Sequence, residues 1–206
     1  MAVSMKLWNI EDDRLRQIHR TRLDYEERLE EWITREPSFL GIDVLLIGRQ
    51  VTTEFGGKID LLGINRQGDL VVIELKRDKT PRQIVAQVLD YASWVRKLTY
   101  DEIGNIAADY LDRSLVVAFS ERFEDPLPDN IDKNHSMLIV ASSLDDTSER
   151  IVQYLTDEYK VNINVAFFTF FGRGGQAYLG RAWLQDPEQV QEVSDSRTKG
   201  PWTFGS

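Results

Sequence analysis

The sequence predicts an α/β fold, in which a central β-sheet is covered by helices. Three observations lead to this fold class. Short apolar segments rich in β-branched and aliphatic residues recur along the chain, as is typical of strands. Other segments carry apolar residues at spacings of three and four, which indicates amphipathic helices. The two kinds of segment are interleaved, so helices and strands are expected to share one core.

The first half of the chain predicts one helix and three strands. Residues 11–36 form the expected helix, with Leu29, Trp32 and Ile33 on one side, and Pro37 ends it because the residue before a proline disfavours helical geometry. The expected strands follow at residues 43–55, 58–65 and 70–77. The last two carry apolar residues on both faces, which suits a sheet covered on both sides.

The second half begins with the clearest predicted helix, at residues 80–98. Thr80 is its expected cap, Pro81 suits its first turn, and its apolar stripe comprises Ile84, Val88, Tyr91 and Val95. Further strands are predicted at 114–120, 136–143, 163–171 and 177–184, and a helix at 145–159. Residues 1–185 thus form one expected domain. Residues 186–206 lack such a pattern, and we expect a tail that is mobile or docked on a partner.

Composition narrows the class of protein. The 206 residues are 42% hydrophobic and 29% charged, as in ordinary globular proteins. The absence of cysteine excludes disulfides and thiolate zinc sites. No signal peptide or membrane-spanning run is evident, so we expect a cytoplasmic protein. The net charge of −9 argues against nonspecific coating of nucleic acid, but not against a nuclease with a local basic rim.

Two acidic residues are predicted to face each other across the hairpin formed by residues 58–65 and 70–77. A three-residue loop with Gly68 at the left-handed position places Asp60 opposite Glu74. Lys76 lies two residues beyond Glu74 and therefore projects from the same face. Two carboxylates and one ammonium are expected to converge in an otherwise apolar setting.

Two explanations of this cluster follow from the residues alone. Opposed like charges destabilise a sheet, so a compensating charge is needed. In the first explanation, Lys76 bridges both carboxylates and the cluster is structural. In the second, the carboxylates bind a hard cation such as Mg²⁺, and Lys76 is free to orient a water or to stabilise a phosphate.

The order of these residues resembles the PD-(D/E)XK nuclease superfamily. Asp60 followed by Glu74-Leu75-Lys76, after a helix that carries glutamate, matches its central motif, and Gln87 with Tyr91 resembles the Gln-x-x-x-Tyr motif of the RecB-like branch. Residues 20–185 are most similar to the NucS-type endonuclease domain. The resemblance implies a restriction-endonuclease-like core with a mixed β-sheet flanked by helices.

The resemblance also implies site residues. Asp60 and Glu74 would coordinate Mg²⁺ or Mn²⁺, the Leu75 carbonyl would add a ligand, and Lys76 would position or deprotonate the attacking water. Gln87 and Tyr91 would brace the site or touch the substrate, although an ordinary helix face explains them equally well.

The family also has an acidic residue on the first helix. Glu26, Glu27 and Glu30 are the candidates here. Glu26 lies at the edge of the buried stripe, so we favour it, with Glu30 second.

The resemblance implies an endonuclease that hydrolyses DNA. The alternatives are a relative that cuts RNA and a catalytically inactive module that binds nucleic acid or protein. Phosphate contacts are expected from basic residues just after the catalytic strand or on the first helix. The residues after the strand are Arg77, Lys79 and Arg82. Those on the first helix are Arg14, Arg16, Arg20 and Arg22. A homodimer is also expected, because cutting both strands needs two sites and the apolar strand at 163–171 exceeds what a monomer edge should expose.

Overall fold

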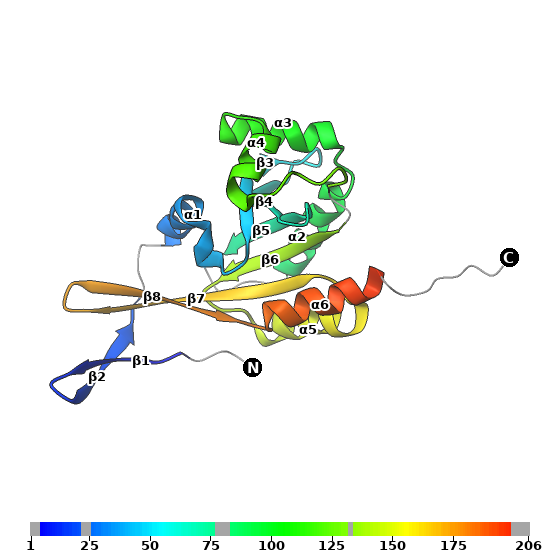
Figure 1. Cartoon of the computed structure of the whole chain (residues 1–206). Helices are drawn as coiled ribbons and strands as arrows, with labels where there is room; N and C mark the ends of the chain where they lie inside the picture. The colour runs from blue at the N-terminus through cyan, green and yellow to red at the C-terminus, as the bar shows by residue number, and fades with distance from the viewer. Residues whose placement is uncertain (1–4, 22–25, 77–82, 132–133, 199–206) are drawn as a thin grey trace.

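The core of the computed structural model is a mixed β-sheet, shown in Figure 1. The structure describes residues 5–21, 26–76, 83–131 and 134–198, and excludes the side chains of residues 26, 27, 197 and 198. The strand order is β1-β2-β7-β6-β5-β4-β3, and β8 pairs with β7. The strands are β1 Leu7–Glu11, β2 Arg14–Arg20, β3 Val44–Thr52, β4 Lys58–Asn65, β5 Leu70–Lys76, β6 His135–Ala141, β7 Ile163–Arg173 and β8 Gln176–Trp183.

Helices cover both faces of this sheet. They are α1 Glu26–Arg35, the 3₁₀ helix η1 Pro37–Leu40, α2 Gln83–Val95, α3 Tyr100–Leu111, α4 Leu115–Phe123, α5 Asp146–Tyr159 and α6 Pro187–Thr198. One apolar cluster joins α2, α3, α4 and α5 to the sheet, and a second joins α1 and η1 to the sheet (Figure 1). The predicted α/β class, with a mixed sheet flanked by helices, is confirmed.

The central hairpin has the predicted register. Leu61 pairs with Ile73 and Ile64 with Leu70. The Asn65 amide donates to the Asp69 carbonyl at 2.9 Å, and Gly68 has a φ of +83°. A residue with a side chain adopts that backbone conformation at a cost, so glycine suits this position. This register places Asp60 opposite Glu74.

Helix α2 packs against β5 and β6 through the predicted stripe. All four of its members are buried, namely Ile84, Val88, Tyr91 and Val95. The polar residue Gln87 lies between them, half-buried, and so reaches the sheet beside the end of β5. This packing determines where the polar side chains of α2 meet the strand.

The prediction of a single helix over residues 11–36 is wrong for its first half. Residues 7–20 form the β1–β2 hairpin, whose turn residues Asp12 and Asp13 have φ angles of +50° and +55°. Aspartate tolerates this left-handed conformation, and two such residues form the tight turn that joins twisted strands. Helix α1 begins only at Glu26. Arg14, Arg16 and Arg20 therefore lie on β2, and Arg22 is outside the described residues.

The predicted strand at residues 114–120 is also wrong, because this segment forms α4. The Ser114 side chain accepts from the Val117 amide and caps the helix. Phe119 and Phe123, four residues apart, are buried with ring centroids 4.6 Å apart. The β-branched residues that suggested a strand, Val116 and Val117, are exposed. Tertiary packing of the two phenylalanines thus overrides local strand propensity.

Two further features of the C-terminal half differ from expectation. Residues 187–198, expected to lie in a tail without regular structure, form α6, which packs against α5 and β7 with Val190 buried. Strand β7 is not an edge, because it pairs with β6 on one side and with β8 on the other. Its apolar residues are buried in the chain itself. The surface argument for a homodimer is therefore lost. Within the described residues, no helix has the length and apolarity to cross a membrane.

Candidate active site

The predicted polar residues meet just beyond the last backbone pair between β4 and β5, which joins Leu61 and Ile73. Here the Asp60 carboxylate replaces a backbone partner, because its Oδ2 accepts from the Leu75 amide at 2.8 Å. Glu74 and Lys76 flank Leu75 on β5, and α2 supplies Gln87 and Tyr91 from the adjoining layer.

Glu74 is the centre of the cluster. Its side chain is 2% exposed, whereas that of Lys76 is 31% exposed. Lys76 Nζ and Gln87 Nε2 both donate to the same oxygen, Glu74 Oε1, at 2.8 and 2.7 Å. The other oxygen, Oε2, is buried and has no hydrogen-bond partner among the described residues. A buried polar atom without a partner is rare and destabilising, so this oxygen calls for a physical explanation.

Tyr91 holds Gln87 in place. Its hydroxyl accepts from Gln87 Nε2 at 2.9 Å and from the Lys58 amide at 3.2 Å. The amide of Gln87 therefore joins the tyrosine of α2 to the glutamate of β5. The structure places both residues as a brace of Glu74.

Burial dominates the electrostatics of Glu74. Removal from water raises the pKa of this carboxyl from 4.5 to about 7, although the hydrogen bond from Lys76 lowers it. The negative charge of Asp60 acts in the same direction as burial. Glu74 thus titrates near neutrality, and a cation beside it would favour its ionised form.

A cavity of about 200 Å³ opens beside this cluster. Its described lining consists of Leu29, Glu30, Gln50, Asp60, Leu75, Lys76, Ser142, Phe168 and Phe170. Three of the predicted residues, Asp60, Leu75 and Lys76, therefore line the same cavity. The buried Glu74 directly precedes Leu75 in the chain. A larger cavity of about 520 Å³, between α6 and the opposite ends of β5 and β6, contains none of the predicted site residues.

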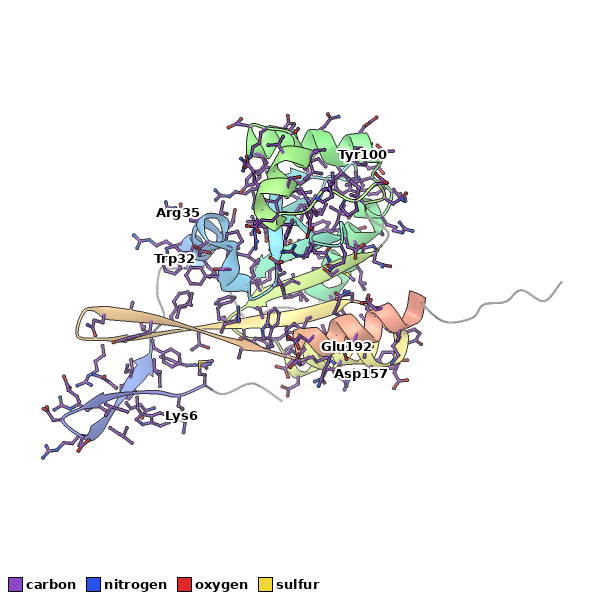
Figure 2. All side chains as sticks on the ribbon, viewed as in Figure 1. Lys6, Trp32, Arg35, Tyr100, Asp157 and Glu192 are labelled. Atoms are coloured by element: carbon purple, nitrogen blue, oxygen red, sulfur yellow. The ribbon has the colours of Figure 1, made fainter. Side chains whose placement is uncertain are left out.

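The wall on the α1 side is held by aromatic and ionic contacts. Trp32 of α1 packs on Phe170 of β7 with ring centroids 6.0 Å apart, and Figure 2 shows Trp32 between the helix and the β7–β8 hairpin. Arg49 Nε donates to Glu30 Oε1 at 2.7 Å. Hydrogen bonding to Glu30 raises the pKa of Arg49.

The structure narrows, but does not decide, which glutamate of α1 belongs to the site. Glu30, our second choice, lies on the cavity wall. The side chains of Glu26 and Glu27 lie outside the description, so the preference for Glu26 stays a prediction. The expected phosphate-binding residues Arg77, Lys79 and Arg82 also fall outside the described residues.

Several cavity residues were not predicted as part of the site. Gln50 and Ser142 carry no signal of their own, since each belongs to the site only through the folding of the chain around it. Phe168 and Phe170 lie in the aromatic segment at residues 163–171, which was predicted as a strand rather than as part of the site. The structure agrees on burial, and it adds that these two rings line the cavity.

The ligand chemistry of the cluster suits a hard cation. Among the residues with described side chains, no three histidine, cysteine, aspartate or glutamate side chains are grouped to hold a metal ion. Magnesium requires less, since one or two carboxylates with waters and phosphate oxygens suffice. Asp60, Glu74 and the Leu75 carbonyl offer donors of this kind, and Glu74 Oε2 has no hydrogen-bond partner among the described residues.

Comparison with known proteins gives one family match and two solved structures. Residues 25–111 match the family model described as the endonuclease NucS C-terminal domain. A repair endonuclease from Pyrococcus abyssi is 19% identical with a TM-score of 0.41, over 71% of this chain and 48% of that chain. A structure described as an EndoMS–dsDNA2 complex is 18% identical with a TM-score of 0.44, over 71% and 46%. The chain thus spans about half the length of these two proteins.

Proposed function

We propose that this chain is a metal-dependent endonuclease that hydrolyses phosphodiester bonds in DNA, on the premise that residues 25–111 match the family model of the endonuclease NucS C-terminal domain. The match includes every predicted catalytic residue from Glu26 to Tyr91. The observation that carries the proposal is the state of Glu74. Its carboxylate is buried and braced, yet one of its oxygens has no partner in the described part of the chain.

A divalent ion would supply that partner. Asp60, Glu74 and the Leu75 carbonyl would hold Mg²⁺ or Mn²⁺, which polarises a phosphate and acidifies a bound water. The chain itself fixes the carboxylates: the Leu75 amide orients Asp60, and Gln87 orients Glu74. Because these contacts exist before substrate binds, little reorganisation is required during the reaction.

Lys76 would act on the attacking water. Lys76 lines the cavity and its ammonium donates to Glu74 Oε1, where it could orient a water or stabilise the charge that develops on a phosphate. The contact with Glu74 keeps the ammonium on the cavity side of the cluster. This role is consistent with the partial exposure of the Lys76 side chain, which leaves room for a water beside the ammonium.

A noncatalytic binding module is the second candidate. The Lys76–Glu74 ion pair is the observation that favours it, because an ammonium can neutralise a buried carboxylate without any metal. Lys76 reaches only Glu74 in the described contacts, whereas Asp60 accepts from Gln50 and Leu75. A lysine bridge to both acids, as the structural explanation requires, is not formed among these residues.

Cleavage assays test the proposal directly. We expect the purified protein to cut at least one of circular, linear, single-stranded or branched DNA with Mg²⁺ or Mn²⁺, and EDTA should abolish the cutting. Glu74→Ala should lose activity. Glu121→Gln, which alters an exposed carboxylate of α4, is the matched control and should retain it. Failure of the wild type on every substrate, or activity that survives Glu74→Ala, would refute the enzyme. RNA substrates in the same assay test the RNA-cutting alternative.

Calorimetric titration with Mn²⁺ separates the enzyme from the binding module. An active site should bind the ion, and Asp60→Asn should remove the binding because the ligand set loses a charge. The melting temperature of Asp60→Asn should stay close to that of the wild type. If the wild type takes up no Mn²⁺ while folded, the binding-module function replaces the proposed one.

A further inference from the structure

Gln50 of β3 connects the two acids that line the cavity. Its Nε2 donates to Asp60 Oδ1 at 3.1 Å and lies 3.4 Å from Glu30 Oε1, which also accepts from Arg49. The Leu75 amide occupies the other Asp60 oxygen. Both oxygens of Asp60 are therefore held by donors from the two neighbouring strands, and the orientation of the carboxylate is fixed from both sides.

The backbone of Gln50 is strained. It has a φ of +53°, which few residues other than glycine adopt without cost. The other non-glycine residues with positive φ in the described chain have local reasons: Asp12 and Asp13 form a turn, while Asp112, Glu124 and Lys160 end helices. Gln50 instead lies within a strand. Strain of this kind collects at functional sites, where the surrounding fold maintains it.

A β-bulge brings Gln50 to this position. The pairing of β3 with β4 shifts between Leu46 and Gly48, so that Arg49 pairs with Leu61 and Val51 with Ile59. Gln50 consequently lies opposite Asp60. Without the shift, the register of Leu45 with Ile64 would continue to Arg49 opposite Asp60. The bulge therefore replaces a cation by a neutral amide next to this carboxylate, and it turns Arg49 toward Glu30 instead.

We propose that Gln50 is a positioning residue for the metal-binding site: its amide holds the Asp60 carboxylate and ties it to α1 without contributing a charge. An arginine at this place would neutralise Asp60 and compete with a divalent ion, whereas an amide donates a hydrogen bond and leaves the negative charge available. Residues that orient metal ligands in this way commonly change affinity or activity by about 10–100-fold when they are removed. The inference rests on the proposed function.

The test is Gln50→Gly, because glycine accepts the left-handed backbone and deletes only the amide. We expect Mn²⁺ affinity, measured by calorimetry, to fall by about 10–100-fold. We also expect kcat on DNA to fall while KM changes little. Lys160→Gly is the control for relieving a positive φ, since Lys160 ends α5 away from the site. Both variants should melt at or above the wild-type temperature.

The outcomes separate this inference from the function beneath it. If the wild type binds Mn²⁺ and cuts DNA, and Gln50→Gly binds the ion within about twofold of it, only the role of Gln50 is overturned. If the wild type does neither, the proposed function fails, and the role of Gln50 fails with it. Should Gln50→Gly not fold, Gln50→Asn decides, because asparagine tolerates the backbone but is one methylene too short to reach Asp60.

Discussion

Replacing Glu74 by glutamine should change how the stability of the protein depends on pH. The wild-type Glu74 side chain is buried, and burial raises the pKa of its carboxyl from 4.5 to about 7. Between these two values the folded state binds a proton that the unfolded chain has released. Stability from this group is therefore complete below about pH 4.5, declines as the pH rises, and is absent above about pH 7.

The size of the effect follows from the shift. Between pH 5 and pH 8 the wild type should lose roughly 2–3 kcal/mol of unfolding free energy through this one group, because each unit of pKa shift corresponds to about 1.4 kcal/mol. The amide introduced by Glu74→Gln has no proton to exchange in this range, so the variant lacks this loss. The stability of the variant relative to that of the wild type should thus grow by roughly 2–3 kcal/mol from pH 5 to pH 8, or about 5–10 °C in melting temperature.

Urea unfolding in EDTA at pH 5, 6, 7 and 8 measures the effect. The comparison between pH values cancels any constant cost of the substitution, and Glu121→Gln controls for the loss of an exposed carboxylate. Parallel stability curves for the wild type and Glu74→Gln would show that Glu74 is ionised in the fold at pH 5, and the argument from burial would then be wrong.

Three further predictions, on four substitutions, test the packing around the site and the corrected fold. Lys76→Met should lower the free energy of unfolding by about 2 kcal/mol at pH 8, and by less at pH 5, where the buried Glu74 is protonated. Equal losses at the two pH values in urea unfolding would contradict this. Gly57→Ala should cost about 1–3 kcal/mol and reduce cleavage, because the added Cβ would lie 2.6 Å from the ring of Tyr91, and an unchanged melting curve would oppose it. Phe119→Ala should cost about 3–5 kcal/mol while Val117→Ala costs little, since α4 buries one and exposes the other; similar losses would favour a strand, where both share a face.

The central hairpin could be predicted from the sequence because its information is local. A glycine in the loop fixes the register, and the register alone opposes Asp60 to Glu74. The apolar stripe of α2 likewise specifies a helix and the face it buries, which brings Gln87 to the end of β5. Residues related by a short loop or by one helical turn are thus within reach of sequence reasoning.

Features set by tertiary contacts were missed. Val116 and Val117 suggest a strand, but burial of Phe119 decides for α4. The β1–β2 hairpin depends on two aspartates in left-handed conformation, and its arginines resemble those of a helix that continues into α1. In each case a local pattern suits two structures, and a contact distant in sequence selects one of them.

The bulge in β3 marks the limit of sequence reasoning for the site itself. A regular ladder would set Arg49 against Asp60, and the acids would then be neutralised from within the protein. The structure instead accepts a strained Gln50 beside Asp60 and, among the described residues, an unpartnered oxygen on Glu74. Both features lower the stability of the chain taken alone. Gln50 lines the cavity, and so do Leu75 and Lys76, the two residues that follow Glu74 in the chain. A bound divalent cation would satisfy the free oxygen and use the charge that the bulge preserves on Asp60. The proposed metal site would thus account for both local defects, whereas a structural ion pair between Lys76 and Glu74 would account for neither.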